Sequence, residues 1–452
     1  MPGLSHLLFT NATIEGLFTA EAQVRAMLRF EQALAQAEAA VGLLPAAAAA
    51  VIAAECQQPD WDVAALARQT LLAGNPAIPL VKMLTQRVAQ HDAEAAKYVH
   101  FGATSQDVLD TALMLQLQSA LAFIDGQLNE LLGALATLAT AHRDTLMMGR
   151  TLLQQARPIT FGYKVAGWLD ALLRARERLA RLRAEALVLQ FGGAVGTLAT
   201  LGEQGPAVAA HLASELQLAA PLVPWHGQRD RLVELAAALG IVAGTLGKLG
   251  HDVVLLMQTE VGEVRESAAA GKGGSSAMPH KRNPVAATFL VAIAGRTPAL
   301  VGQLLAALPQ HEHERAAGAW HAEWDTLPAL CSLVAAALTH ATDLVRGLEV
   351  DADRMRHNLD LTQGLIFAED VTAALMPHLG KTAAHQLIET ASREAPRQGL
   401  ALQAYLRQQP QVTQHLNNMA LSVLFDPAHA TGLSQYFTDQ VLARFHASAA
   451  SI

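Results

Sequence analysis

The chain has 452 residues, of which 52% are hydrophobic and only 5% aromatic, so its core must be built mainly from aliphatic side chains. The net charge of −8 comes from interspersed acidic and basic residues, and no basic tract indicates a nucleic-acid partner. The two cysteines, Cys56 and Cys331, fit neither a metal cluster nor a disulfide framework. We therefore expect buried thiols in a reducing compartment.

No targeting or membrane segment is expected. Residues 1–20 contain no basic segment ahead of an apolar run, which excludes the pattern of a secretory signal. Apolar runs such as residues 42–54 are too short to span a bilayer, and this one contains Pro45. We expect a cytoplasmic protein without membrane association.

The chain divides into three predicted helical domains. Residues 1–110 are predicted to form shorter helices that turns interrupt. Residues 111–350 contain much longer helical patterns, and residues 351–452 predict a smaller helical domain. Because no run of alternating β-branched residues is long enough for a major sheet, the predicted fold class is all-α.

Three of the predicted helices are long. Apolar residues recur at i, i+3, i+4 and i+7 over residues 110–141, 160–188 and 230–266. The last of these patterns has few charges and is apolar on more than one side. Such a helix is typical of a bundle core or a subunit interface.

A loop at residues 271–284 interrupts this helical pattern with the sequence Gly-Lys-Gly-Gly-Ser-Ser-Ala-Met-Pro-His-Lys-Arg-Asn-Pro. Its glycines and prolines cannot continue a helix. Backbone N–H groups in a Gly-rich turn can hold an anion, and Lys281 and Arg282 add positive charge. The sequence therefore predicts an anion-binding site, with a solvated connector as the alternative.

Polar residues also precede a long helix near residue 105. Thr104, Ser105 and Asp107 stand immediately before an apolar-periodic run, which favours a helix N-cap at Ser105 or Asp107. That interpretation leaves His100 and Gly102 unexplained. Hydroxyl and N–H groups at the start of a helix would also suit an anion.

A second polar group occurs at residues 149–160. Arg150, Thr151, Gln154 and Arg157 lie before a predicted helix, and Pro158 suits the first turn of that helix. Charged residues beside a helix start are often solvated surface groups, and this remains the alternative.

Two further segments favour structural roles. The glycines of residues 191–197 are expected to allow tight turns or close packing, and Arg229 is expected to pair with Asp230. His311 and His313 could suggest a metal site. Their spacing is not H-E-x-x-H, and residues two apart do not share a helix face, so no metal is expected.

The sequence of the loop at residues 271–284 resembles the signature loop of the fumarase/aspartase superfamily. Four other blocks within residues 95–325 follow in the family's order. The resemblance implies a mostly helical homotetramer whose core is a central bundle of long helices. It also implies chemistry through a carbanion that a neighbouring carboxylate stabilises, without a metal or organic cofactor.

The resemblance also implies roles for individual residues. Ser275 would carry the proton, with Lys281 and Asn283 stabilising the carbanion; Ser276 is the rival proton carrier. Each active site would combine regions of different subunits. The residues that the family pattern places on the substrate are His100, Thr104, Ser105, Arg150, Thr151, Gln154, Ser276, Met278 and Arg315.

One departure from the family pattern discriminates between reactions. Lyases of the superfamily carry Arg-Thr-His at residues 150–152, whereas this chain has Leu152. Their histidine helps a poor leaving group to take a proton. A carboxylate of the substrate, with a pKa of about 3.9, is already ionised and can attack a double bond within its own molecule without a base.

The departure therefore favours a lactonising cycloisomerase that acts on a small tricarboxylate. The enzymatic alternative is an elimination like that of adenylosuccinate lyase, which releases fumarate. A third interpretation is a catalytically inactive structural homologue. A degraded signature loop would indicate such a protein. The loop of this chain is intact.

Overall fold

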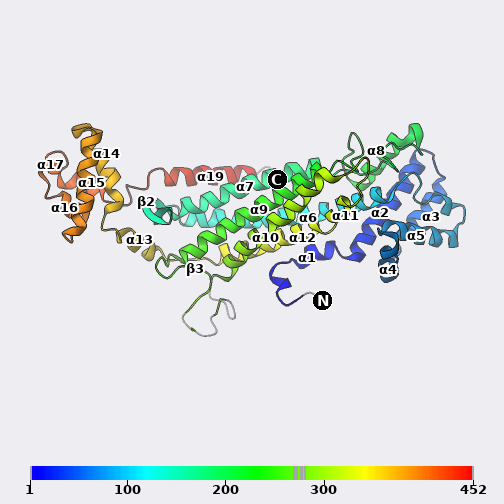
Figure 1. Ribbon diagram of the computed structural model, residues 1–452, viewed down its shortest axis with the longest axis horizontal. Coiled ribbons are helices and arrows are strands. Elements are labelled where there is room, and N and C mark those ends of the chain that lie inside the picture. Colours follow the sequence, from blue (N-terminus) through cyan, green and yellow to red (C-terminus); the bar gives the residue numbers. More distant parts are fainter. Residues whose placement is uncertain (1–2, 268–272, 275–277, 279–280, 450–452) are drawn as a thin grey trace. The chain divides into compact units, whose positions relative to one another are not determined.

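The structure is a computed structural model that describes residues 3–267, 273–274, 278 and 281–449 (Figure 1). Its described residues are mainly helical, which confirms the all-α fold class. The long helices are α6 (Ser105–Ala141), α7 (Phe161–Ala186), α9 (Asp230–Leu256), α10 (Val285–Ala307) and α12 (Thr326–Arg346).

Shorter helices precede, connect and follow these. They are α1 (Ala12–Leu17), α2 (Ala20–Ala40), α3 (Ala46–Cys56), α4 (Val63–Ala73), α5 (Ala77–His91), α8 (Gly205–Leu216), α11 (Ala319–Glu323), α13 (Ala352–Asp360), α14 (Ala368–Leu379), α15 (Lys381–Arg397), α16 (Leu402–Leu406), α17 (Pro410–Thr413), α18 (Asn418–Leu424) and α19 (Ser434–Ala449). The four strands are β1 (Leu146–Thr151), β2 (Gln154–Thr160), β3 (Val264–Arg265) and β4 (Glu349–Val350).

The first compact unit comprises Met1–Leu128, Ala175–Leu246 and Ala292–Thr339. Within it, α2 packs against α3 and α8 (Figure 1). Buried leucine, alanine and valine side chains form the core, as the low aromatic content requires. Both cysteines are buried thiols, as predicted, and burial raises the pKa of the Cys331 thiol to about 12.

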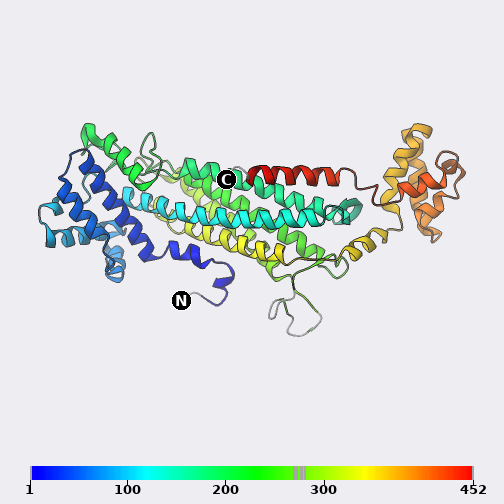
Figure 2. The ribbon, with the colours of Figure 1, turned by 180° about the vertical axis from the view of Figure 1, so that it is seen from behind.

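The second compact unit comprises Asn129–Arg174, Gly247–Val291 and His340–Ile452. Its strands β1 and β2 pair as an antiparallel hairpin, drawn in teal in Figure 2. Helix α13 packs against β1, and β3 pairs with β4. Helices α14 to α18 surround a separate apolar core that includes Val371, Leu375, Ile388 and Leu406.

The hairpin corrects one prediction. Pro158 does not open a helix; it lies in β2 opposite Met148, in a two-stranded sheet that tolerates a residue without an N–H group. Helix α7 begins at Phe161 instead. Thr160 marks this start, because its hydroxyl accepts the backbone N–H of Tyr163 at 3.2 Å.

The predicted helix over residues 230–266 is too long. Helix α9 ends at Leu256, and a turn that contains Gly262 with φ of 62° leads into β3. The left-handed conformation at Gly262 cannot continue a helix. The turn places Glu263 next to the hairpin, where its carboxylate pairs with Arg150.

Among the described residues, four helical segments are long and apolar enough to cross a membrane by length and composition alone. In three of them, Ser105–Ala141, Asp230–Leu256 and Ala319–Arg346, 61–72% of the most apolar window is buried inside the protein. In Val285–Gln310 only 28% is buried. The apolar surface of this segment is therefore left largely uncovered by the chain itself.

Candidate active site

The start of α6 brings together three of the predicted substrate-binding residues. The Arg315 guanidinium donates to the Thr104 hydroxyl at 2.6 Å and to the Ser105 hydroxyl at 3.3 Å. Its Nε also donates to the side-chain oxygen of Gln106 at 3.3 Å. A planar cation, two hydroxyls and the N-terminus of a 37-residue helix form a suitable environment for a carboxylate.

Asp107 fixes the conformation of this helix start. Its buried carboxylate accepts the backbone N–H of Thr104 at 3.0 Å, as one half of a capping box. It also accepts the backbone N–H groups of Gly192 and Gly193 at 3.0 and 2.9 Å. His226 contacts the same carboxylate at 2.7 Å, a role that the sequence analysis missed.

His100 lies beside this arrangement with a left-handed backbone, φ 60°. Burial lowers the pKa of His100, but the Glu31 carboxylate, 2.7 Å from its Nδ1, outweighs burial and holds that pKa above its ordinary value. Close packing here requires glycine at 193, since an added Cβ would lie 2.9 Å from the carbonyl oxygen of Gly102.

Arg229 does not pair with Asp230, contrary to the prediction. Its guanidinium is buried and donates to both oxygens of Asp110, at 2.6 and 2.9 Å, and to Glu323 at 2.6 Å. Burial favours a lower pKa for Arg229, but Asp110 and Glu323 hold it above its ordinary value. The charges come from three distant chain segments, so local sequence could not reveal this network.

The network connects to the carboxylate-binding residues through Gln106. The Gln106 amide donates to Asp110 at 3.1 Å, while its oxygen accepts from Arg315. At the other end, His311 contacts Glu323 at 3.0 Å. Among the described residues no three His, Cys, Asp or Glu side chains form a group that could hold a metal ion.

In the second unit, Arg150 forms a bidentate ion pair with the buried Glu263, at 2.9 and 2.7 Å. Asn358 donates to the same carboxylate at 2.8 Å. The positive charge of Arg150, which follows the bulge of the hairpin, is therefore balanced by Glu263. Thr151 and Gln154 flank the tip of this hairpin and are exposed.

The hairpin tip itself consists of Leu152 and Leu153. Their φ values are 49° and 64°, and their side chains are 93% and 79% exposed. Tight turns of this kind favour Asn-Gly, because a left-handed backbone is strained for leucine. Leu152 and Leu153 therefore combine a strained backbone with side chains that lie in solvent.

Arg157 lies in β2 and pairs with two acids of the second unit. It forms ion pairs with Glu369 at 2.8 Å and with Asp370 at 2.5 Å, at the start of α14. These contacts tie β2 to the helices that follow it, so Arg157 has a structural role within the second unit.

The signature loop is described only in part. Ser275 and Ser276 lie outside the described residues. Asn283 closes the loop base, because its backbone N–H donates to the carbonyl of Gly273 at 2.9 Å and its amide donates to Gly274 at 3.3 Å.

The other polar residues of the loop have different surroundings. Arg282 forms a bidentate pair with Glu349 at 2.8 and 2.9 Å, so its charge is balanced there. Met278 is partly exposed, and its carbonyl accepts the backbone N–H of Lys281 at 3.0 Å. Among the described residues, no carboxylate forms an ion pair with the Lys281 ammonium.

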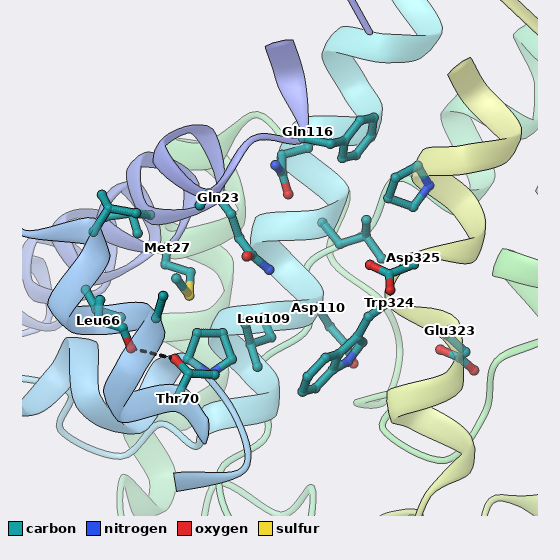
Figure 3. A pocket seen from close by; sticks show the side chains of 18 of the residues that line it. Gln23, Met27, Leu66, Thr70, Leu109, Asp110, Gln116, Glu323, Trp324 and Asp325 are labelled. Carbon is teal, nitrogen blue, oxygen red and sulfur yellow. Dashed lines mark hydrogen bonds between the residues drawn. The ribbon is translucent and has the colours of Figure 1, made fainter. Parts of the chain in front are cut away.

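A largely apolar cavity of about 340 Å³ lies in the first unit (Figure 3). Met27 and Leu66 lie on one side of it, and Asp110 and Trp324 lie across from them. Thr104, Ser105 and Arg315 do not line this cavity. It is therefore distinct from the predicted carboxylate site.

The helical fold, and a helix start at which Arg315 contacts two hydroxyls, are features expected of a lyase-family enzyme. Comparison with known proteins agrees: the family model described as Lyase matches residues 9–298, and that described as adenylosuccinate lyase C-terminus matches residues 364–441. The chain belongs to this lyase family, within the fumarase/aspartase superfamily, as the loop sequence predicted.

Individual relatives are similar over nearly the whole chain. The 3-carboxy-cis,cis-muconate cycloisomerase of Pseudomonas aeruginosa is 54% identical over 97% of this chain and 95% of its own. The crystal structure of the 3-carboxy-cis,cis-muconate lactonizing enzyme from Pseudomonas putida has a TM-score of 0.91 and 49% identity, and covers 98% of this chain and 99% of its own. The nitrosuccinate lyase of Streptomyces davaonensis is 43% identical and covers 97% and 94%.

Proposed function

We propose that this chain is a 3-carboxy-cis,cis-muconate cycloisomerase of the protocatechuate branch of the β-ketoadipate pathway. A carboxylate of the substrate adds to a conjugated double bond of the same molecule, and 4-carboxymuconolactone forms. The similarity of the whole chain to enzymes of this activity carries the proposal. Leu152 supports it, because this reaction needs no imidazole to protonate a leaving group.

The proposed reaction adds a carboxylate oxygen and a proton across one double bond of the substrate. The attacking carboxylate oxygen forms a bond to one alkene carbon, and the π electrons move to the neighbouring carbon, which takes the hydroxyl proton of Ser275. The Ser275 alkoxide then regains a proton from solvent, so each turnover consumes one proton. A negative charge develops on the carboxylate next to that carbon, where Lys281 and Asn283 stabilise it. Because the nucleophile belongs to the substrate, orientation replaces activation. No cofactor is needed.

The proposed substrate contacts divide between two groups. Arg315, Thr104 and Ser105 hold one carboxylate at the start of α6, where their mutual hydrogen bonds support the assignment. His100 lies beside this first group. The proposed second group comprises Arg150, Thr151, Gln154, Ser276 and Met278. Direct substrate contact by these residues remains a prediction.

We propose a homotetramer in which each active site combines regions of different copies. The 37 residues of α6 correspond to a helix of about 55 Å, with Thr104 before its first residue and Arg150 beyond its last. The uncovered apolar surface of Val285–Gln310 suits burial against a second copy rather than a membrane. On this proposal the enzyme is cytoplasmic, and its three domains are residues 1–110, 111–350 and 351–452.

One ultraviolet assay tests the function. The purified protein should remove the diene absorbance of 3-carboxy-cis,cis-muconate, and it should release no fumarate from adenylosuccinate. Arg315→Met should lose most of the first activity, whereas the exposed Arg181→Met should keep it. Release of fumarate without loss of the diene absorbance would contradict the proposal and favour an elimination like that of adenylosuccinate lyase.

Mixing experiments test the composite site. Thr104→Val and Lys281→Met variants should each have little activity alone, and a mixed tetramer should regain part of it, because some sites then contain no altered residue. Differently tagged copies establish that subunits have exchanged. Proven exchange without any recovery would contradict the composite arrangement.

A further inference from the structure

Glu31 of α2 is a buried carboxylate that neither the sequence analysis nor the proposed mechanism uses. Its side chain is 1% exposed, and its Oε1 lies 2.7 Å from Nδ1 of His100. The two residues are 69 positions apart in the sequence, so only the fold brings them together. Among the described residues, the imidazole of His100 is the one basic side chain within ion-pair distance of Glu31.

The other acidic groups of α2 and α3 near Glu31 are neutral or already paired. Glu38, two turns further along the same face of α2, is fully buried, and within the described part of the chain its two oxygens have no hydrogen-bond partner. An ionised carboxylate would be unstable there, and burial and then Glu31 raise the pKa of Glu38 to about 8. Glu55 pairs with Arg87, and burial raises the pKa of the Cys56 thiol and so keeps it neutral. Glu31 therefore carries the negative charge that faces the imidazole.

His100 lies in the segment that leads into the carboxylate-binding start of α6. It is the fourth residue before Thr104, and its backbone is left-handed with φ of 60°. Asp107 holds this segment in place, because its carboxylate accepts the backbone N–H groups of Thr104 and Gly193 at 3.0 and 2.9 Å. The carbonyl oxygen of Gly102 packs so closely on Gly193 that an added Cβ would be only 2.9 Å away. His100 is thus fixed beside the proposed carboxylate site.

The contact with Glu31 decides what the other ring nitrogen of His100 can do. A carboxylate beside Nδ1 accepts a hydrogen bond from that nitrogen, so a neutral ring would have a lone pair at Nε2. A lone pair repels a substrate carboxylate, whereas an imidazolium presents an Nε2–H group to it. Burial lowers the pKa of His100, but the charge and hydrogen bond of Glu31 outweigh burial and hold that pKa above its ordinary value. Asp107, whose carboxylate also contacts His226, acts in the same direction.

We propose that Glu31 is a positioning residue that fixes the ring of His100 as an imidazolium, and that this imidazolium binds the substrate carboxylate next to Arg315. The inference rests on the proposed function, which supplies a carboxylate substrate. The ion pair brings no net charge of its own. Its contribution is direction, because Nε2–H is a charge-assisted donor whose orientation Glu31 sets before the substrate arrives. Arg315, whose described partners are neutral oxygens, supplies the uncompensated charge.

The test compares three variants of the full-length protein: Glu31→Gln, Glu31→Asp and, as the matched control, Glu15→Gln. Glu15 also contacts a histidine, His6, at 2.6 Å, but the two side chains are 38% and 40% exposed. Calorimetry measures the dissociation constant of an unreactive anion, propane-1,2,3-tricarboxylate, over a range of pH. The ratio of each variant to the wild type at one pH cancels the titration of the anion itself.

Glu31→Gln keeps the shape of the side chain and removes its charge. At neutral pH it should weaken anion binding roughly 10-fold, the usual effect of losing a hydrogen bond to a charged group. Because burial then sets the pKa of His100 below its ordinary value of 6.5, the loss should disappear as the pH falls further below that value. Glu31→Asp keeps the charge and should keep most of the affinity, and Glu15→Gln should match the wild type. Full affinity in Glu31→Gln, or a loss that is equal at every pH, would overturn the proposal.

The titration of His100 can also be followed in the wild type, so the test does not depend on a variant that folds. Exchange of the imidazole C2 hydrogen for deuterium, read by mass spectrometry of peptides, gives the pKa of a single histidine. That pKa should lie above 6.5 in the wild type and in Glu15→Gln, and below it in Glu31→Gln; a wild-type value at or below 6.5 would overturn the proposal. Neither measurement needs turnover. The expected results in a protein that does not convert 3-carboxymuconate would therefore count against the proposed function alone.

Discussion

Replacing Arg229 by methionine should destabilise the protein strongly. Arg229 is only 1% exposed, and its guanidinium bridges Asp110 and Glu323, with the Trp225 ring 4.7 Å from its central carbon. Methionine fills part of the volume but leaves two buried carboxylates without their cation. Removal of one partner from a buried ion pair costs about 3–5 kcal/mol, because the remaining charge is desolvated and uncompensated.

The matched control is Arg181→Met. Arg181 also bridges two acids, Glu185 and Glu234, but it is 52% exposed. Exposed ion pairs contribute at most about 1 kcal/mol, since water and salt screen them. The two arginines therefore differ in burial rather than in the number of carboxylate partners.

The measurement is urea unfolding followed by tryptophan fluorescence. It is made at one fixed protein concentration, because the stability of the proposed tetramer depends on concentration. We expect a much lower transition midpoint for Arg229→Met and a nearly unchanged one for Arg181→Met. Catalytic efficiency should fall in Arg229→Met as well, because Gln106 links Asp110 to Arg315. Equal midpoints for the two variants would refute the reasoning that burial sets the cost.

Three further predictions concern other parts of the chain. Leu152→His should neither create release of fumarate from adenylosuccinate nor accelerate lactone formation, in steady-state assays on both substrates; a clear gain on adenylosuccinate would favour the elimination. Ser275→Ala should lose most turnover while the oligomer stays intact by size-exclusion chromatography, whereas full activity there with loss in Ser276→Ala would move the proton carrier by one residue. Burial and then Glu31 raise the pKa of Glu38 from 4.5 to about 8, so the folded state binds the proton more tightly than the unfolded state. The resulting stability is fully present below pH 4.5 and is lost as pH rises to about 8; Glu38→Gln should flatten that slope in urea titrations, and an identical slope would contradict the assignment.

The helical fold was predictable because apolar periodicity is a local property. The pattern at residues 160–188 came close to the observed α7, Phe161–Ala186. The break after Leu256 was not predictable in the same way. Residues beyond it still suit a helix. The turn at Gly262 is stabilised by the ion pair of Glu263 with Arg150, which is far away in sequence.

The candidate site was predictable where the polar residues are adjacent in sequence. The adjacent hydroxyls of Thr104 and Ser105 predict both a helix start and an anion-binding site. Their partner Arg315 was found by family resemblance, because periodicity carries no information about a contact across 210 residues. His226 was missed for the same reason: only the fold shows that it meets Asp107.

The arginines differ in whether a carboxylate of the protein compensates their charge. Arg150, Arg157 and Arg229 each form an ion pair with at least one carboxylate, so their positive charge is compensated inside the protein. Arg315 differs, because its described partners are neutral oxygens of Thr104, Ser105 and Gln106.

Neutral acceptors fix the direction of a guanidinium without cancelling its charge. The Arg315 guanidinium is therefore oriented before any ligand arrives, which reduces the entropy cost of binding a carboxylate. Its full charge remains available to that carboxylate. The buried pair of Arg229 and Asp110 makes this possible, because it anchors Gln106 while keeping the acids away from Arg315. We therefore predict that changes which weaken the buried network also weaken carboxylate binding, because Gln106 contacts both Asp110 and Arg315.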